Sequence, residues 1–254
     1  MWRQVVIVVP CYNESARLRL DLFASFAAGS NDLGFLFVND GSTDASAEVL
    51  SSAVADHPEH FATLSLPRNV GKGEAVRAGL RQAVSNGASV VGFWDADLAT
   101  PLAELPGMLA VLDGREGIEG VLGARVRLLG RSVERRRSRH YLGRVFGTLA
   151  SVVLRLPVYD TQCGAKVFVV TDELIFAIKE PFCSRWIFDV ELLGRLRAGW
   201  GGRAHERLEE YPLRSWADVD GSKLRGRHFL RAAWDLLRIW RQMSQGRAEE
   251  ENGA

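Results

Sequence analysis

The chain has few of the features that would place it at once in a large class of proteins. Its three cysteines, Cys11, Cys163 and Cys183, are scattered and show no C-x-x-C spacing. An odd set of this kind argues against a disulfide framework or a zinc site and favours a reducing compartment. The 32 basic and 31 acidic residues leave a formal net charge of +1. No overall positive field therefore indicates a nucleic-acid partner.

Long apolar runs are also missing. A membrane-spanning helix needs about 20 mostly apolar residues, whereas the longest candidate, Val145 to Leu154, is closed by Arg155. The N-terminal run from Val5 to Val9 is too short for the core of a signal peptide and has no small-residue cleavage site after it. We therefore expect a cytoplasmic protein, and 254 residues with 47% hydrophobic content suit one large globular domain.

Short apolar runs alternate with segments of helical periodicity. We expect strands near residues 4–9, 35–38, 62–66, 90–98 and 120–123, and helices over 15–28, 44–54 and 72–85 and after Pro101. Ser15 is the expected cap of the first helix. Repeated strand–helix units predict an α/β fold in which a mostly parallel sheet is covered by helices on both faces.

The fourth expected strand, Val90 to Leu98, ends in two carboxylates, Asp95 and Asp97. Strand alternation would put both on one side, where they could hold one cation. Oxygen ligands of this kind suit Mg²⁺ or Mn²⁺, which also bind substrate phosphates. The alternative is a strand-end turn with solvated aspartates.

Polar residues follow each of the first four strands, and in open α/β sheets ligands bind beyond the carboxyl ends of the strands. The residues collected there are Tyr12, Asn13, Glu14, Asp40, Arg68, Lys72, Asp95 and Asp97. Each has a plain structural reading, as a packing aromatic, a turn residue or a helix entry. Their joint placement predicts a nucleotide pocket with a cation beside its phosphates.

Four motifs in this order resemble those of family 2 glycosyltransferases: Pro10–Glu14, Val38–Asp44, Arg68–Gly73 and Asp95–Asp97. Four later segments resemble the dolichyl-phosphate β-glucosyltransferase branch, which has polyprenyl-phosphate mannosyltransferases among its relatives: Gly123–Arg125, Asp160–Lys166, Arg185–Leu193 and Gly221–Leu224. The resemblance covers most of residues 4–245. It implies a GT-A fold, a nucleotide-sugar donor, one divalent metal, Mg²⁺ or Mn²⁺, and inversion at the anomeric carbon.

The resemblance also implies roles for particular residues. Donor-binding roles fall on Pro10, Tyr12, Glu14, Asp40, Lys72, Asp95, Ala96 and Asp97. Acceptor- or phosphate-binding roles fall on Arg125, Gln162, Arg185 and Lys223. Asp97, with Asp95, would bind the metal, and Asp97 and Asp189 are the expected catalytic residues. Ala99 stands where the mannosyl branch often has a metal-binding glutamine, which favours the glucosyl branch and a metal that relies more on water.

Asp189 has two open roles. It lies at the expected start of a helix, where a carboxylate is favoured electrostatically. If the acceptor is a sugar hydroxyl, inversion requires a base and Asp189 is the best candidate. If the acceptor is a lipid phosphate, no base is required, and Asp189 would position the donor sugar or the loop that carries Lys223.

The second half of the chain contains two amphipathic segments. Arginines recur between Arg125 and Arg144, ahead of the apolar stretch Tyr141 to Leu154, and aromatic and basic residues mix from Phe229 to Met243. Such segments suit a peripheral contact with the anionic cytoplasmic face of a membrane, or packing against the domain. We expect a catalytic domain over residues 1–225, an amphipathic helix over 226–245 and a disordered tail over 246–254.

Two other classes compete with the transferase. A Rossmann oxidoreductase would need G-x-G-x-x-G directly after the first strand, where this chain has Pro10 to Glu14. A non-enzymatic lipid-surface adaptor would have no use for two aspartates beside a nucleotide pocket. The favoured function is transfer of a hexose, glucose from UDP-glucose, to a polyprenyl phosphate. The alternative is transfer to a soluble saccharide or phosphorylated small molecule, with GDP-mannose as a further donor.

Overall fold

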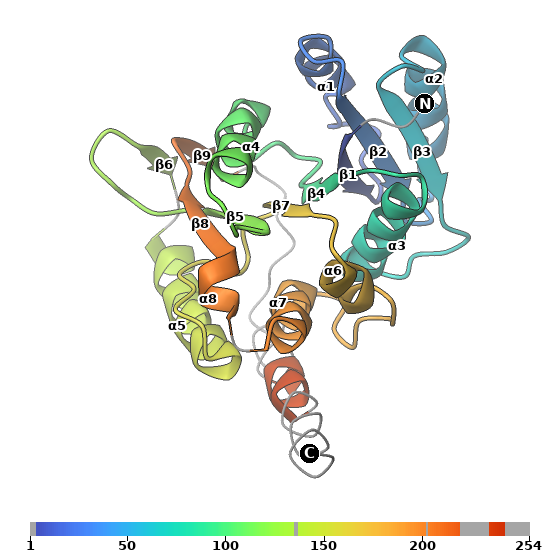
Figure 1. Ribbon diagram of the computed structural model, residues 1–254. Coiled ribbons are helices and arrows are strands. Elements are labelled where there is room, and N and C mark those ends of the chain that lie inside the picture. Colours follow the sequence, from blue (N-terminus) through green and yellow to red (C-terminus); the bar gives the residue numbers. More distant parts are fainter. Residues whose placement is uncertain (1–3, 135–136, 202, 219–233, 242–254) are drawn as a thin grey trace.

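The computed structural model describes residues 4–134, 137–201, 203–218 and 234–241 (Figure 1). The strands are β1 (Val5–Cys11), β2 (Leu33–Asn39), β3 (Phe61–Ser65), β4 (Val90–Trp94), β5 (Gly120–Ala124), β6 (Ser132–Glu134), β7 (Ala165–Val169), β8 (Leu208–Pro212) and β9 (Ser215–Ala217). The helices are α1 (Leu20–Ala27), α2 (Ser46–Asp56), α3 (Lys72–Ser85), the 3₁₀ turn η1 (Leu102–Glu104), α4 (Leu105–Gly114), α5 (Arg137–Leu154), α6 (Asp172–Ala177), α7 (Phe188–Gly199) and α8 (Ala204–Arg207).

One seven-stranded sheet runs through the molecule in the order β3-β2-β1-β4-β7-β5-β8. Only β7 is antiparallel to its neighbours β4 and β5, while the other adjacent pairs are parallel. A second, two-stranded sheet pairs β6 with β9. The predicted α/β fold with a mostly parallel sheet is confirmed. The sequence patterns did not reveal β7, β8 or the small sheet.

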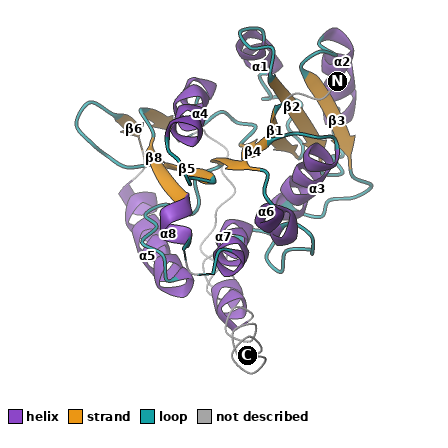
Figure 2. Ribbon diagram, viewed as in Figure 1, coloured by secondary structure: helices purple, strands orange, loops and turns teal. Residues whose placement is uncertain are grey.

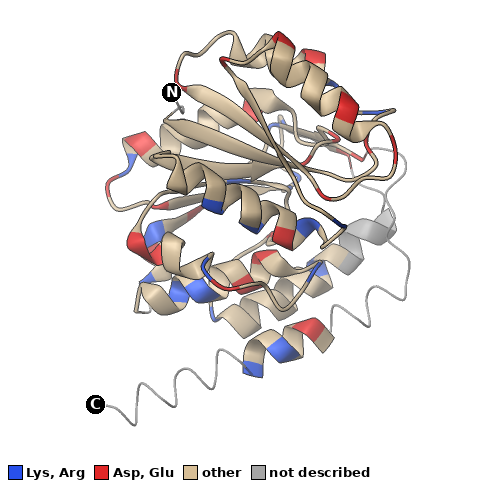
Figure 3. Ribbon diagram, turned by 90° about the vertical axis from the view of Figure 1, so that its right-hand side faces the viewer, with Lys and Arg blue, Asp and Glu red and all other residues tan. Residues whose placement is uncertain are grey.

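Helices cover both faces of the central sheet (Figure 2). Successive residues of β1 alternate between two cores: Val6 and Val8 pack with α3, α7 and residues of α5, whereas Ile7 and Val9 pack with α1, α2 and α4. Because both faces are buried, the strands β1 and β4 are apolar throughout instead of alternating with polar residues. Charged residues therefore lie mainly in loops and on helices, where both signs are interspersed (Figure 3).

Two local predictions were wrong. The first helix begins at Leu20 and not near Ser15, because the Ser15 hydroxyl donates to Asp44 Oδ2 at 2.6 Å and is held in the loop before the helix. The fourth strand ends at Trp94, so Asp95 and Asp97 lie in a turn beyond it instead of alternating along it. The Leu98 amide donates to the Asp95 carbonyl at 3.2 Å and closes this turn.

The helical residues 234–241 pack beside α7 (Figure 1). Leu236 and Ile239 are buried in the core, and Asp235 Oδ2 accepts a 2.7 Å hydrogen bond from the Ser184 hydroxyl. Trp234 and Trp240 remain exposed on the same segment. Among the residues described, no helix combines the length and apolarity that a bilayer crossing requires. The predicted boundary at residues 225 and 226 lies outside the described part.

Candidate active site

The loops after β1 and β2 lie side by side and are joined by hydrogen bonds. These strands are in register up to Cys11 and Asn39, so their following loops leave the sheet together. The Thr43 amide donates to Asn13 Oδ1 at 2.8 Å, and the Asn13 amide donates to the Ser42 hydroxyl at 3.0 Å. Asn13 has a φ of 54°, a conformation that asparagine tolerates better than most residues. The expected meeting of these two loops at one edge of the sheet is confirmed.

Asp40 holds the third loop against the second. It is buried, and its Oδ1 accepts from the Val70 amide at 2.7 Å while its Oδ2 accepts from the Gly71 amide and from Asn69 Nδ2, both at 2.9 Å. Burial raises the pKa of the Asp40 carboxyl, and the amide hydrogen bonds oppose that rise. The structure thus places Asp40 as the organiser of the loop that leads into α3.

Gly41 makes this contact between loops possible. Its φ of 62° is a left-handed conformation, and a side-chain carbon there would lie 2.3 Å from the Arg68 carbonyl carbon. Only glycine combines that backbone conformation with such a close approach. The motif that carries Asp40 therefore includes Gly41 for a packing reason.

The edge of the sheet where the loops after β1, β2, β3 and β4 meet is called the rim below. Lys72 and Asp95 form an ion pair of 2.5 Å at this rim. Burial disfavours the ammonium of Lys72, but the charges of Asp95, Asp189 and Asp97 outweigh burial and raise the pKa of this lysine. Asp95 itself rests against Gly164, whose carbonyl accepts from the Asp95 amide at 3.0 Å. A side-chain carbon on Gly164 would lie 1.9 Å from Asp95 Oδ2, so this position has no room for a larger residue.

Asp97 lies beside this pair and forms no ion pair with any described residue. Its Oδ1 accepts from the Ala99 amide at 3.1 Å. Burial, and next the charge of Asp95, raise the pKa of the Asp97 carboxyl. A half-buried carboxylate beside a second one is a place where a cation would be favourable.

The residues present fit a metal that is shared with a ligand. No group of three or more His, Cys, Asp or Glu side chains in the described part of the chain could enclose a metal ion. Mg²⁺ and Mn²⁺ are commonly held by one or two carboxylates, waters and substrate phosphates. Asp97 is the suited protein ligand, while Asp95 is engaged by Lys72.

Glu14 is paired with Arg17, a residue that the sequence patterns did not single out. Arg17 Nη2 donates to Glu14 Oε1 at 2.5 Å, and this hydrogen bond to Glu14 raises the pKa of Arg17 despite its partial burial. The charge of Asp97 also acts on Arg17. Arg17 therefore brings a cation to the side of the site where Asp97 lies.

Arg125 is fixed by Asp160 through three hydrogen bonds. Its backbone amide and Nε donate to Asp160 Oδ2 at 3.1 and 2.6 Å, and its Nη2 donates to Oδ1 at 2.8 Å. Asp160 is in turn held by Glu210, which accepts from the Tyr159 and Asp160 amides at 2.8 Å each. Burial raises the pKa of Glu210. Nearby, Gln162 Nε2 is buried and has no hydrogen-bond partner among the described residues.

Asp189 lies in the first turn of α7 and is 5% exposed. Its Oδ1 accepts from Lys166 Nζ, on β7, at 2.6 Å. Lys166 was missed by sequence reasoning, although a lysine inside an otherwise apolar strand was the available signal. The negative charge of Asp189 also helps to raise the pKa of Lys72, which links Asp189 electrostatically to the rim.

The structure brings most of the predicted residues to one rim but separates Arg185 from Arg125. Arg185 Nη2 donates to Asn69 Oδ1 at 2.6 Å, on the side of the loop that Asp40 holds. Pro10 lies near the end of β1 and Tyr12 directly follows this strand at the same edge, and Ala96 is buried in the Asp95 turn. Lys223 lies outside the described residues. The individual ligand-binding roles remain predictions.

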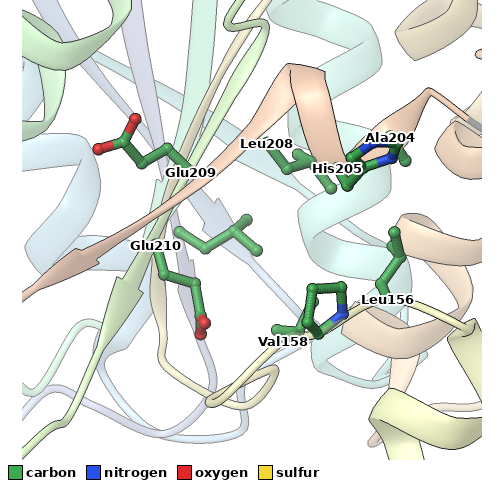
Figure 4. Close-up of a pocket in the computed structure, with 9 residues that line it drawn as sticks. Leu156, Val158, Ala204, His205, Leu208, Glu209 and Glu210 are labelled. Carbon is green, nitrogen blue, oxygen red and sulfur yellow. The ribbon is translucent and has the colours of Figure 1, made fainter.

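A small cavity of about 110 Å³ lies apart from this rim, between β8, α8 and the segment from Leu156 to Val158 (Figure 4). Its walls are mostly apolar, and Glu209 and Glu210 point in different directions beside it. None of the residues predicted for the site lines it. It is therefore not the donor pocket.

Comparisons with known proteins agree with this geometry. The family model described as Glycosyl transferase family 2 matches residues 6–172. The chain is 30% identical over 244 residues to a dolichyl-phosphate beta-glucosyltransferase of Trichomonas vaginalis, covering 91% of this chain and 69% of the relative. It is 29% identical to the dolichyl-phosphate beta-glucosyltransferase of Saccharomyces cerevisiae, covering 86% of this chain and 68% of the relative.

Among solved structures, glucosyl-3-phosphoglycerate synthase from Mycobacterium tuberculosis in complex with UDP aligns with a TM-score of 0.65 at 20% identity. The alignment covers 94% of this chain and 80% of that chain. At this identity the likeness concerns the fold, and it confirms the GT-A expectation. The matched motifs, the relatives and the fold agree, and the chain belongs to glycosyl transferase family 2 and is a glycosyltransferase.

Proposed function

We propose that this enzyme transfers a hexose, glucose from UDP-glucose, to a polyprenyl phosphate with inversion at the anomeric carbon. The observation that carries the proposal is the 30% identity to a dolichyl-phosphate beta-glucosyltransferase along 91% of the chain. A shorter match of 108 residues, at 38% identity, is to an undecaprenyl-phosphate 4-deoxy-4-formamido-L-arabinose transferase of Pectobacterium carotovorum. Both relatives are named for a polyprenyl-phosphate acceptor.

On the donor side, the loops held together by Asp40 and Asn13 form a rigid rim for the base and ribose, beside the half-exposed Tyr12. Lys72 and Asp97 lie where the diphosphate would reach. A divalent cation, Mg²⁺ or Mn²⁺, would supply Lewis-acid stabilisation of the negative charge that develops on the leaving diphosphate. A structure of the mycobacterial synthase contains Mn²⁺, UDP-glucose and phosphoglyceric acid together, which supports this choice of cofactor.

On the acceptor side, Arg125 offers a guanidinium whose orientation Asp160 fixes, and the buried Gln162 Nε2 meets no acceptor in the described part of the chain. A phosphate oxygen suits both donors. A phosphate monoester is largely ionised near neutral pH because its second pKa is about 6. Attack by this oxygen therefore needs no general base, and Asp189 serves to position the donor sugar.

A donor and acceptor screen tests the proposal. UDP- and GDP-linked hexoses are incubated with Mn²⁺ and three acceptors: a short-chain polyprenyl phosphate, free saccharides, and 3-phosphoglycerate, the small phosphate compound named for the structural neighbour. We expect product on the polyprenyl phosphate with UDP-glucose. Product only on a soluble acceptor, or only from GDP-mannose, would favour the alternative function.

Two variants refine the assignment of the acceptor side. Arg125→Ala and Lys223→Ala should raise the KM for the polyprenyl phosphate more than the KM for the donor, because charged hydrogen bonds to phosphate are lost. Glu209→Gln is the control, because Glu209 lies on β8, pairs with Arg115 and belongs to no predicted site; it should leave both constants within about twofold of the wild type. Equal changes in both KM values would contradict the acceptor role.

A further inference from the structure

Lys166 is the one lysine among the described residues whose side chain is fully buried, at 0% exposure. Lysines are almost never buried in this way unless they are paired. The position is also central, because β7 lies between β4 and β5 and Lys166 pairs in register with Phe93 and Leu122. The ammonium is thus enclosed between the sheet and the first turn of α7.

The Lys166 ammonium has two hydrogen-bond partners and one aromatic neighbour. Its Nζ donates to the Cys163 carbonyl at 2.5 Å and to Asp189 Oδ1 at 2.6 Å. It also lies 5.1 Å from the centre of the Phe93 ring, a distance at which a cation is attracted to the ring face. These contacts leave the ammonium little freedom to rotate.

These contacts complete a ring that encloses the centre of the site. Asp189 acts on Lys72, Lys72 pairs with Asp95, and the Asp95 amide donates to the Gly164 carbonyl. Gly164 follows Cys163, whose carbonyl returns the ring to Lys166. Positive and negative side chains alternate from Lys166 through Asp189 and Lys72 to Asp95. The ring therefore includes both the turn that carries Asp95 and the first turn of α7.

Within this ring, the two oxygens of Asp189 are not equivalent. Oδ1 is tied to Lys166, whereas Oδ2 has no hydrogen-bond partner among the described residues. Lys166 holds the carboxylate through Oδ1, so the direction of Oδ2 is fixed as well. A group that approaches from the rim would therefore meet an oxygen of fixed direction.

Stability alone is a weak explanation for this pair. Replacing a buried ion pair by apolar residues is often neutral or stabilising, because removing two charges from water is costly. Asp189 also has a local reason to be at the start of α7, where a carboxylate is favoured without any lysine. The electrostatic link of the pair to Lys72 at the rim instead favours a role in turnover.

We propose that Lys166 is a positioning residue for the transfer reaction, which acts by fixing the Asp189 carboxylate so that Oδ2 faces the reacting groups. The inference rests on the proposed function for its kinetic readout. It assigns no contact with substrate to Lys166, which is enclosed on all sides. Its effect should therefore appear in kcat and should leave the binding of the nucleotide unchanged.

The first test replaces Lys166 by methionine, which keeps the length of the side chain and removes its charge. We expect kcat to fall on the order of a hundredfold, as misplacement of a reacting group by about 1 Å can produce. We expect the KM for the donor, and the affinity for UDP with Mn²⁺ measured by calorimetry, to stay within about twofold, because Lys166 does not reach the donor. A fall in UDP affinity that matches the fall in kcat would overturn the proposal.

Arg195→Met is the matched control. Arg195 pairs with Glu191, another buried carboxylate of α7, at 2.6 Å, but its remaining hydrogen bonds go to carbonyls at Ala177, Glu180 and Pro181. The Arg195→Met substitution therefore breaks a comparable ion pair of the same helix, away from the rim. We expect kcat within about twofold of the wild type in the folded variant, as for a structural pair outside the site. An equal loss of kcat in both variants would assign Lys166 a merely structural role.

A double variant keeps the proposal testable if Lys166→Met does not fold, because replacing both partners leaves no unpaired buried charge. Lys166→Met with Asp189→Asn should turn over within about twofold of Asp189→Asn alone, since Lys166 acts through Asp189. A further loss of about a hundredfold in the double variant would overturn the inference.

A crystal structure of Lys166→Met separates this inference from the proposed function. The Asp189 carboxylate should rotate from its present orientation, whatever the enzyme's substrates are. A carboxylate that does not move would overturn the positioning role even if the polyprenyl-phosphate transfer is established. Absence of transfer to polyprenyl phosphate in the wild type would refute the proposed function alone, and the kinetic test would then use the acceptor found in the screen.

Discussion

Replacing Asp97 by asparagine removes one negative charge at the tip of β4 and keeps the shape of the side chain. Loss of the cation that Asp97 would bind removes several kcal/mol of leaving-group stabilisation, so transfer should fall on the order of a thousandfold. Asparagine can still accept the Ala99 amide hydrogen bond of 3.1 Å, so the turn should persist. The assay is initial-rate turnover at saturating donor, with the folded state checked by circular dichroism. Asp97→Ala should show the same loss of transfer.

Thermal unfolding gives a second readout for the same variant. At a concentration of Mn²⁺ and UDP about 100 times the Kd, binding stabilises the wild type by about 2.7 kcal/mol. In a protein of this size that corresponds to a rise in Tm of roughly 5–10 °C. Asp97→Asn should lose most of this rise.

The metal-free proteins should differ in the opposite direction. Burial and the charge of Asp95 raise the pKa of Asp97 above its value of 3.8 in the unfolded chain. The folded state therefore binds this proton more tightly, and the stabilising contribution is complete below pH 3.8 and is lost as the pH rises through the folded pKa. At pH 7 the ionised carboxylate of Asp97 destabilises the folded state, so metal-free Asp97→Asn should be at least as stable as the wild type.

Asp113→Asn is the control, because Asp113 is exposed on α4. It should leave turnover and the Mn²⁺-dependent rise in Tm unchanged. Near-wild-type turnover of folded Asp97→Asn, or an undiminished rise in its Tm with Mn²⁺ and UDP, would refute the assignment of Asp97 to the metal.

Three further predictions concern other parts of the molecule. Gly164→Ala should abolish transfer in a folded protein, because the added carbon would lie 1.9 Å from Asp95 Oδ2; turnover like that of the wild type would contradict the close contact. Asp189→Asn should reduce transfer to a polyprenyl phosphate moderately, whereas a base for a saccharide hydroxyl would cost roughly 10² to 10⁴ in rate; parallel assays with both acceptors separate these roles. Sedimentation with anionic vesicles should weaken on charge reversal at Arg135–Arg137, since each basic residue contributes about 1 kcal/mol, and on Leu149→Glu in the exposed face of α5; sedimentation insensitive to both changes would refute a membrane contact there.

The sequence alone determined the order of the early elements and the edge at which the site forms. Apolar runs such as Val5–Val9 and the loop motifs after them are local signals, because a strand that is buried on both faces consists of consecutive apolar residues. Asp95 and Asp97 were identified from their place after such a run. The register of β1 and β2 then makes the predicted meeting of loops a direct consequence of parallel pairing.

The error at Ser15 shows the limit of local signals. A serine before a periodic segment is a good helix cap in isolation, but here its hydroxyl bonds Asp44, 29 residues along the chain. The competing partner belongs to another loop, and no pattern near Ser15 encodes it. The antiparallel direction of β7 is similar, because a short strand that is apolar except for Lys166 fits either direction of pairing.

Only the tertiary structure decided which charges face each other. Lys166 and Asp189 are 23 residues apart and meet because β7 enters the middle of the sheet beneath the first turn of α7. Arg125 and Asp160 are 35 residues apart and meet because β5 lies next to β7. An ion pair leaves no periodic pattern in the sequence that would identify its two partners. The partner of a charged residue is decided only when the topology brings two segments together and excludes water between them.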